Sequence, residues 1–236
     1  FIDFWGNHII KELTKANLSV FSYIKRLKSL KNLNQKTNCD LVTFLDNHDE
    51  AGSFIKKRIA TLFNQDQHLC GLAMLIMLPG TPCLYYGTEI NLEGEGQNDC
   101  QIRYPMFNSE SETKLHNTNH ETYKFIQKLN EIRKEINNTS NVLFKINSFR
   151  ITNKPNKQSY FKDKKILCVK WTNKLIDWLL IFSFDDYSTI EIETKKNTKN
   201  KILQKHNHIH TIEDNKITIK LIGTGFTILK TKKRAN

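Results

Sequence analysis

The chain has 236 residues, of which 39% are hydrophobic, enough for one large or two modest folded domains. Its formal net charge is +12, but most of the 36 basic residues are lysines spread along the chain without an arginine-rich stripe. We therefore expect a solvated basic surface and no nucleic-acid partner. The sequence has no run of about 18 apolar residues, which excludes a membrane-spanning helix.

The five cysteines are odd in number and form no C-x-x-C pair. This pattern argues against a disulfide framework and a structural zinc site, and several of the cysteines lie in apolar runs typical of buried thiols. No oxygen-rich cluster has EF-hand spacing, so no metal and no other cofactor is predicted. Calcium dependence, oligomeric state and a cytoplasmic or secreted location stay open, as does a signal peptide upstream of Phe1.

The first half of the chain begins with helical spacing of apolar residues over positions 1–31, which predicts one or two amphipathic helices. After a polar loop, an apolar strand is expected from Leu41. It ends abruptly in the polar residues Asp46, Asn47, His48 and Asp49. The cluster indicates either a functional site at the end of a buried strand or an ordinary polar turn.

A second strand follows a helical stretch. Apolar spacing predicts helix over 55–62 and 69–78, as one broken helix or two, and Pro79-Gly80 stops it. Residues 81–87 are a short apolar and aromatic run typical of a buried strand. Strand, helix and strand in succession predict a right-handed crossover and a parallel strand pair.

The rest of the chain changes character twice. Residues 88–118 are polar without a strong period and predict a long loop, and 119–136 have helical spacing. Beyond this helix the pattern predicts an antiparallel β domain, with a boundary that gives domains 1–138 and 139–236. Its expected strands are 142–151, 159–161, 166–171, 178–184, 189–192, 217–222 and 226–229, with a loop at 195–200 and a frayed tail at 231–236.

Three segments together resemble the α-amylase family of glycoside hydrolases. Residues 44–49, Phe-Leu-Asp-Asn-His-Asp, are similar to the motif that ends the family's seventh barrel strand. Residues 80–89 resemble its eighth strand and the loop that leaves it, and 103–107 resemble the Arg-x-Pro-Met-aromatic element that follows. The resemblance covers the whole chain and implies an α/β fold: the C-terminal portion of a TIM (β/α)8 barrel followed by an all-β antiparallel sandwich domain.

The resemblance also implies a retaining reaction on α-glucosidic linkages of starch-like or malto-oligosaccharide substrates, with two carboxyl groups about 5 Å apart across the scissile bond. Asp49 matches a third carboxylate of the family, which stabilises the transition state, and His48 matches its neighbour. Asn47, Arg103 and Tyr86 are the expected substrate-binding residues. The nucleophile and the acid/base match no position, so residues 1–236 are expected to be an inactive part of a longer enzyme.

Alternatives remain for each of these roles. In the alternative interpretation, Asp49 caps the following helix and His48 is packed in the core. The alternative for Arg103 is a surface ion pair with one of the nearby carboxylates, and the alternative for Tyr86 is packing inside the barrel. For the whole chain, the alternatives are an α-glucan or sucrose transglycosylase of the same family, or an amylase-like binding module without catalysis.

Overall fold

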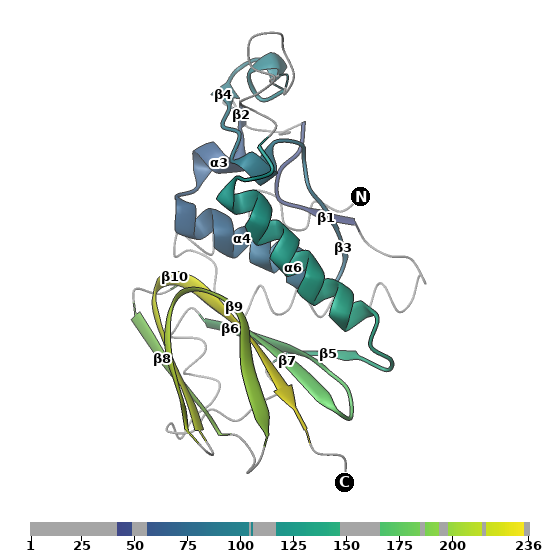
Figure 1. Ribbon diagram of the computed structural model, residues 1–236. Coiled ribbons are helices and arrows are strands. Elements are labelled where there is room, and N and C mark those ends of the chain that lie inside the picture. Colours follow the sequence, from purple (N-terminus) through teal and green to yellow (C-terminus); the bar gives the residue numbers. More distant parts are fainter. Residues whose placement is uncertain are drawn as a thin grey trace. The chain divides into compact units, whose positions relative to one another are not determined.

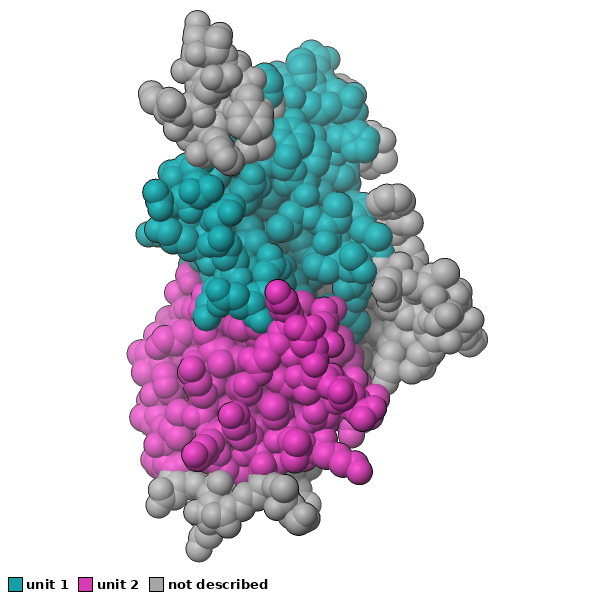
Figure 2. Space-filling model, turned by 45° about the vertical axis from the view of Figure 1, so that its right-hand side comes forward, with its two compact units in different colours: residues 1–11, 30–131 teal, residues 12–29, 132–236 magenta. Residues whose placement is uncertain are grey.

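The computed structural model describes residues 42–48, 56–103, 105, 117–146, 166–184, 187–193, 198–213 and 216–233. The helices predicted over 1–31, the strand predicted at 159–161 and the residue Asp49 lie outside these ranges. The described residues form two compact units, which meet in sequence between Glu131 and Ile132 (Figure 2). The expected domain boundary at 138/139 stays a prediction.

The first unit contains a parallel strand pair. Strand β1 (Val42–Phe44) pairs with β3 (Thr81–Cys83), and the register joins Phe44 to Cys83 at the carboxyl ends (Figure 1). The parallel arrangement predicted from the strand-helix-strand order is therefore confirmed. Because the strands run in the same direction, the residues that follow β1 and those that follow β3 leave the pair at the same edge.

Helix α4 (Gln65–Met77) forms most of the connection between these strands. It begins with a capping box, in which the side chains of Asn64 and Gln67 each accept a hydrogen bond from the other's backbone N–H. It ends just before Pro79-Gly80, as predicted from the sequence. Nearly every side of its second half is buried, with Leu72 to Leu78 at most 1% exposed, so this helix is the core of the unit.

The prediction of a helix over 55–62 is only partly correct. Residues Lys56–Lys57 form the short strand β2, which pairs with β4 (Glu95–Gly96), and only Ile59–Leu62 are helical, as α3. Apolar spacing over so few residues fits a strand followed by one helical turn equally well. Here the strand forms because Lys56–Lys57 pair with β4 in a distant loop. The predicted loop also contains two short 3-10 helices, η1 (Thr88–Ile90) and η2 (Asp99–Gln101).

Helix α6 (Glu121–Asn137) agrees with the helix predicted over 119–136. Its buried side chains recur every three or four positions, at Ile126, Leu129, Ile132 and Ile136. The helix is therefore amphipathic, with one apolar face and one polar face.

The second unit is a six-stranded antiparallel sheet. Its strands are β5 (Leu143–Ile146), β6 (Ile166–Thr172), β7 (Ile176–Ser183), β8 (Tyr187–Glu193), β9 (Lys199–Glu213) and β10 (Lys216–Lys232). The order is β5-β6-β7-β10-β8, and β9 also pairs with β10. The first half of β10 pairs with β8 and the second half with β7, with Gly223 in the left-handed conformation between them.

The long strand β9 was not predicted, and part of it falls in the segment expected to be a loop. Its sequence is rich in lysine, asparagine and histidine and has few of the apolar residues that mark a strand. It forms because it pairs with β10 along both halves of that strand. The expected break between 217–222 and 226–229 is likewise wrong, because β10 runs through it and extends to Lys232, into the predicted tail.

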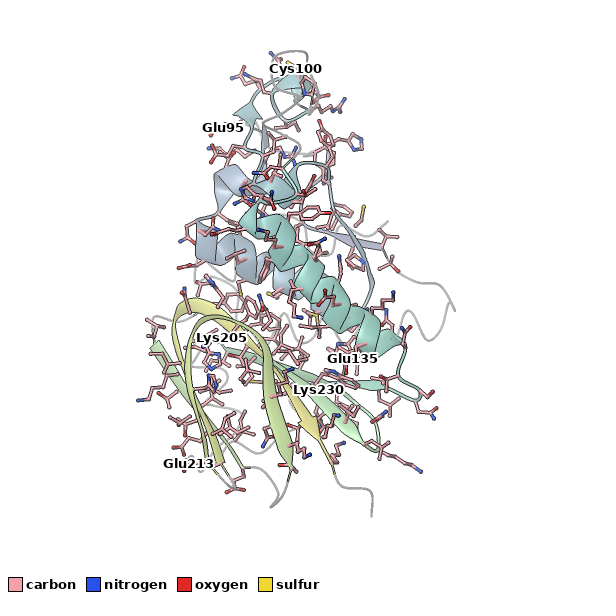
Figure 3. The ribbon with its side chains drawn as sticks, in the orientation of Figure 1. Glu95, Cys100, Glu135, Lys205, Glu213 and Lys230 are labelled. Atoms are coloured by element: carbon pink, nitrogen blue, oxygen red, sulfur yellow. The ribbon has the colours of Figure 1, made fainter. Side chains whose placement is uncertain are left out.

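Buried aliphatic residues of β6, β7, β8 and β10 make the core of this sheet, among them Ile181, Ile190 and Ile219. One charged contact joins the end of α6 to the sheet: Lys230 forms an ion pair with Glu135 (Figure 3). The Nζ atom of Lys230 also lies 5.8 Å from the centre of the Trp178 ring, which is fully buried. Lys230 therefore packs along an aromatic surface while its charge is neutralised.

Candidate active site at the ends of two parallel strands

Polar and aromatic residues gather where β1 and β3 end. Asp46, Asn47 and His48 follow β1, and Tyr85 and Tyr86 follow β3. Asp46 is buried, Asn47 half-buried and His48 exposed. In parallel α/β folds this edge of the sheet is where functional side chains are placed.

Arg58 joins the two strand ends. Its Nε atom donates to a carboxylate oxygen of Asp46 at 3.0 Å, and its Nη2 atom donates to the carbonyl oxygen of Tyr86 at 2.6 Å. The side chains of Arg58 and Asp46 are only 1% and 3% exposed. Water therefore competes little with this charge-assisted pair, and one guanidinium group holds both segments.

The same guanidinium group lies against two aromatic rings. Its central carbon is 4.5 Å from the centre of the Tyr85 ring and 5.3 Å from that of Tyr86. The two rings meet edge to face at 4.5 Å. Burial, followed by the hydrogen bond to Tyr86, raises the pKa of Tyr85 to about 12, so its phenol is neutral around pH 7. Tyr86 as a whole is 37% exposed.

The loop after β3 is fixed in a tight turn. Gly87 has φ of 82°, and a Cβ atom there would lie 2.7 Å from the Leu92 side chain, so the position requires glycine. Further along, the carbonyl oxygen of Gly94 accepts a hydrogen bond from the Arg58 backbone N–H at 2.8 Å. The Gly94 N–H in turn donates to the hydroxyl of Thr61 at 2.9 Å. These contacts tie the loop to the segment that carries Arg58.

Arg103 brings a third segment to the strand ends. Its Nε atom donates to the carbonyl oxygen of His48 at 3.1 Å, and its guanidinium group pairs with Asp99 at 3.0 Å. The surface ion pair considered for Arg103 is thus present, with Asp99 as its partner. The Asp99 pair leaves the Arg103 side chain 42% exposed. A role in binding sugar remains a prediction. It is chemically possible because a guanidinium group has five N–H donors, more than these two contacts use.

Among the predicted site residues, the structure brings His48 and Arg103 into direct contact and links Tyr86, through Arg58, to the segment that carries Asn47 and His48. Asp49 lies outside the described residues. From the sequence, Asp46 is recognised only as part of the polar cluster after the first strand, and Arg58 is not singled out. An arginine between lysines and an apolar helix start looks like any surface residue, and the one available signal was the scarcity of arginine in this lysine-rich chain.

His68 of α4 lies close to this cluster and is buried. Burial, then the positive charge of Arg58 and finally His120, lowers the pKa of His68 to about 4. The imidazole is therefore neutral around pH 7 and adds no second positive charge beside Arg58.

The described cysteines and acidic residues form neither a disulfide nor a cluster that could hold a metal ion. Cys70 and Cys168 are buried, Cys83 and Cys100 are exposed, and all four are free thiols. Within the described ranges, no group of three or more histidine, cysteine, aspartate or glutamate residues is arranged to hold a metal ion. None of the described helices is long and apolar enough to cross a membrane.

Comparison with known proteins identifies the family. Residues 6–220 match the family described as "Alpha amylase, catalytic domain". This chain belongs to the α-amylase family. The resemblance recognised in residues 44–49, 80–89 and 103–107 is thereby confirmed.

Curated relatives of this α-amylase family member include two cyclomaltodextrin glucanotransferases of Niallia circulans. One is 34% identical over 95 residues, which cover 40% of this chain and 11% of the relative. The other is 29% identical over 134 residues, which cover 56% of this chain and 17% of the relative. The matched segments are thus a small part of both relatives.

Solved structures share the fold at low sequence identity. Eubacterium rectale Amy13B aligns over 100% of this chain and 48% of its own, with a TM-score of 0.69 and 18% identity. The cyclomaltodextrin glucanotransferase CldA aligns over 97% of this chain and 43% of its own, with a TM-score of 0.65 and 18% identity. The chain spans about half the length of these proteins.

Proposed function

We propose that this chain supplies part of the active site of a retaining glycoside hydrolase that acts on α-glucosidic linkages in starch-like or malto-oligosaccharide substrates. The observation that carries the proposal is the convergence at one sheet edge: Arg103 contacts His48, and Arg58 bonds both Asp46 and Tyr86. Three family-like segments distant in sequence therefore present polar and aromatic groups together, as a sugar site requires.

In this proposal Asp49 stabilises the transition state. A carboxylate accepts hydrogen bonds from two sugar hydroxyls, and bonds that strengthen as the ring distorts raise the rate as well as the affinity. His48, whose side chain is exposed, donates to the same sugar. Asn47 and Arg103 bind further hydroxyls, and the ring of the exposed residue Tyr86 packs against a sugar face.

We further propose that residues 1–138 are the C-terminal part of a (β/α)8 barrel and residues 139–236 a β-sandwich domain. The parallel pair β1-β3 supports the first assignment, and the antiparallel sheet supports the second. The nucleophile and the acid/base carboxylates then come from a part of the protein outside residues 1–236, since no segment here matches them.

A transglycosylase of the same family is the second candidate, and the two relatives named as cyclomaltodextrin glucanotransferases favour it. The reactions share a covalent glycosyl intermediate and differ in the acceptor, water or a sugar hydroxyl. Product analysis separates them. Hydrolysis of maltoheptaose raises the number of reducing ends, whereas transfer gives longer or cyclic glucans at a constant number of reducing ends.

The test compares residues 1–236 with the longest form of the protein that carries them, both incubated with maltoheptaose. We expect turnover by the longer form and binding without turnover by residues 1–236. Turnover by residues 1–236 alone would contradict the missing-carboxylate proposal. Binding without turnover by both forms would favour an amylase-like binding module, and absence of binding by both would refute the α-glucan proposal.

A further inference from the structure

We propose that Arg58 is a positioning residue that sets the distance and orientation between the two sugar-binding segments of this site. The proposal rests on the proposed function, because it concerns Asn47 and His48 on one segment and Tyr86 on the other. Arg58 itself, 1% exposed, does not touch substrate. It acts through the groups that it holds.

The hydrogen bonds of Arg58 attach both strand ends to one planar group. Nε and Nη2 belong to the same rigid guanidinium group, and they donate to the Asp46 carboxylate and the Tyr86 carbonyl oxygen. The separation of these two acceptors is therefore set by the covalent geometry of one side chain. A lysine ammonium group at the same position is a point charge with rotating donors and imposes no such plane.

Arg58 is itself held from several directions. Its backbone N–H donates to Gly94 in the loop after β3, and the rings of Tyr85 and Tyr86 lie against its guanidinium group. The side chain thus has little freedom to move, and burial keeps water from replacing its partners. A group restrained in this way transmits its position to whatever it binds.

The groups that Arg58 holds adjoin the predicted sugar-binding residues directly. Asp46 immediately precedes Asn47 and His48 in the chain. On the other segment, Arg58 binds the carbonyl oxygen of Tyr86 and lies 5.3 Å from the centre of its ring. Loss of Arg58 therefore removes one restraint from the peptide and ring of Tyr86 and, through Asp46, one from the start of the Asn47–His48 segment.

A purely structural role makes a different prediction from a positioning role. If Arg58 and Asp46 only stabilise the fold, a variant that retains the fold retains sugar binding. The double variant Asp46→Leu/Arg58→Met separates these roles, since replacing a buried ion pair by apolar residues of similar size often leaves stability intact. Arg58→Lys retains the positive charge beside Asp46 and loses the planar fork. Arg133→Lys is the matched control, because Arg133 lies in the second unit and also stacks on an aromatic ring, that of Trp171, at 4.8 Å.

The experiment measures maltoheptaose affinity by calorimetry and the side-chain NMR resonances of His48 and Tyr86 without sugar. We expect both Arg58 variants that fold to bind maltoheptaose at least about ten-fold more weakly, with shifted resonances, and Arg133→Lys to match the parent. Affinity within two-fold of the parent in a folded Arg58 variant, with unchanged resonances, overturns the proposal. If the parent binds no maltoheptaose, the proposed function fails. Shifted His48 and Tyr86 resonances then still support the positioning role, and unchanged resonances overturn it.

Discussion

Arg103 Nε donates a hydrogen bond to the carbonyl oxygen of His48 at 3.1 Å, although the two residues are 55 positions apart in the sequence. The contact binds the long polar loop to the end of β1. It also places a guanidinium group, which has more N–H donors than its two contacts with described residues use, next to the predicted sugar site, while Asp99 neutralises part of its charge.

Replacing Arg103 by glutamine is expected to weaken maltoheptaose binding about ten-fold or more, because an oriented charged donor next to His48 is lost. Asp99→Asn is the control. It removes the exposed ion pair, which contributes about 0–1 kcal/mol, and leaves the guanidinium group in place. Calorimetric titration with maltoheptaose measures both. If the ion pair with Asp99 is the whole role of Arg103, both variants bind like the parent.

Asp46→Asn is expected to destabilise the first unit by about 3–5 kcal/mol, since it leaves the buried guanidinium group of Arg58 without a carboxylate. The double variant Asp46→Leu/Arg58→Met removes both members of the buried ion pair and is expected to cost much less than the sum of its single substitutions. Urea unfolding of the parent, of Asp46→Leu, of Arg58→Met and of the double variant gives the coupling free energy between the two side chains. Additive effects would show that the two side chains do not stabilise each other.

His68 makes the first unit sensitive to acid. Its pKa is about 4 in the folded protein, lowered by burial and the Arg58 charge from the ordinary histidine value of 6.5. Between these values the unfolded chain binds more protons, so stability present above about pH 6.5 is lost as the pH falls toward about 4. The loss between pH 7 and pH 5 is about 2 kcal/mol.

Hydrogen exchange of α4 amides at pH 7 and pH 5 measures this effect. His68→Leu is expected to remove most of the acid sensitivity of α4. His208→Leu is the matched control: burial first, then His210 and Lys205, lowers the pKa of His208 to about 4, but in the second unit. An equal loss of acid sensitivity in α4 for both variants would contradict the assignment to His68.

The four described cysteines are expected to differ in reactivity. Cys83 and Cys100 are exposed, whereas complete burial of Cys70 and Cys168 raises the pKa of both thiols and keeps them protonated. Iodoacetamide added to the native protein is expected to modify Cys83 and Cys100, and to reach Cys70 and Cys168 only after unfolding. Mass spectrometry of the digested protein reads each site. Modification of Cys168 while the protein remains folded would contradict the burial of β6.

The sequence predicts well those elements that local pattern decides. Helix α4 ends just before Pro79-Gly80, and α6 follows its three- and four-residue spacing, because backbone sterics and amphipathic burial act within a few residues. The parallel pair follows from the order of its elements. Strand β9 could not be predicted in this way, because its polar sequence is held by pairing with β10 and carries little strand signal of its own.

The same division applies to the site. Asn47, His48, Tyr86 and Arg103 come from segments with a recognisable pattern, and the structure brings His48 and Arg103 together. Arg58 was missed, and Asp46 was named only as a member of the polar cluster, because their pairing depends on burial and on contacts between segments 12 and 28 positions apart. Neither burial nor such pairing is visible in a single sequence.

The most direct test of the central claim, an α-glucan site at the ends of β1 and β3, is the rate of maltoheptaose conversion by Asp49→Asn in the longest form of the protein. Asparagine retains the size of the side chain and removes the charge that is proposed to stabilise the transition state. We predict that kcat/KM falls by about 100-fold or more, as expected when an electrostatic contact to the transition state is lost. A kcat/KM within two-fold of the parent would contradict the account.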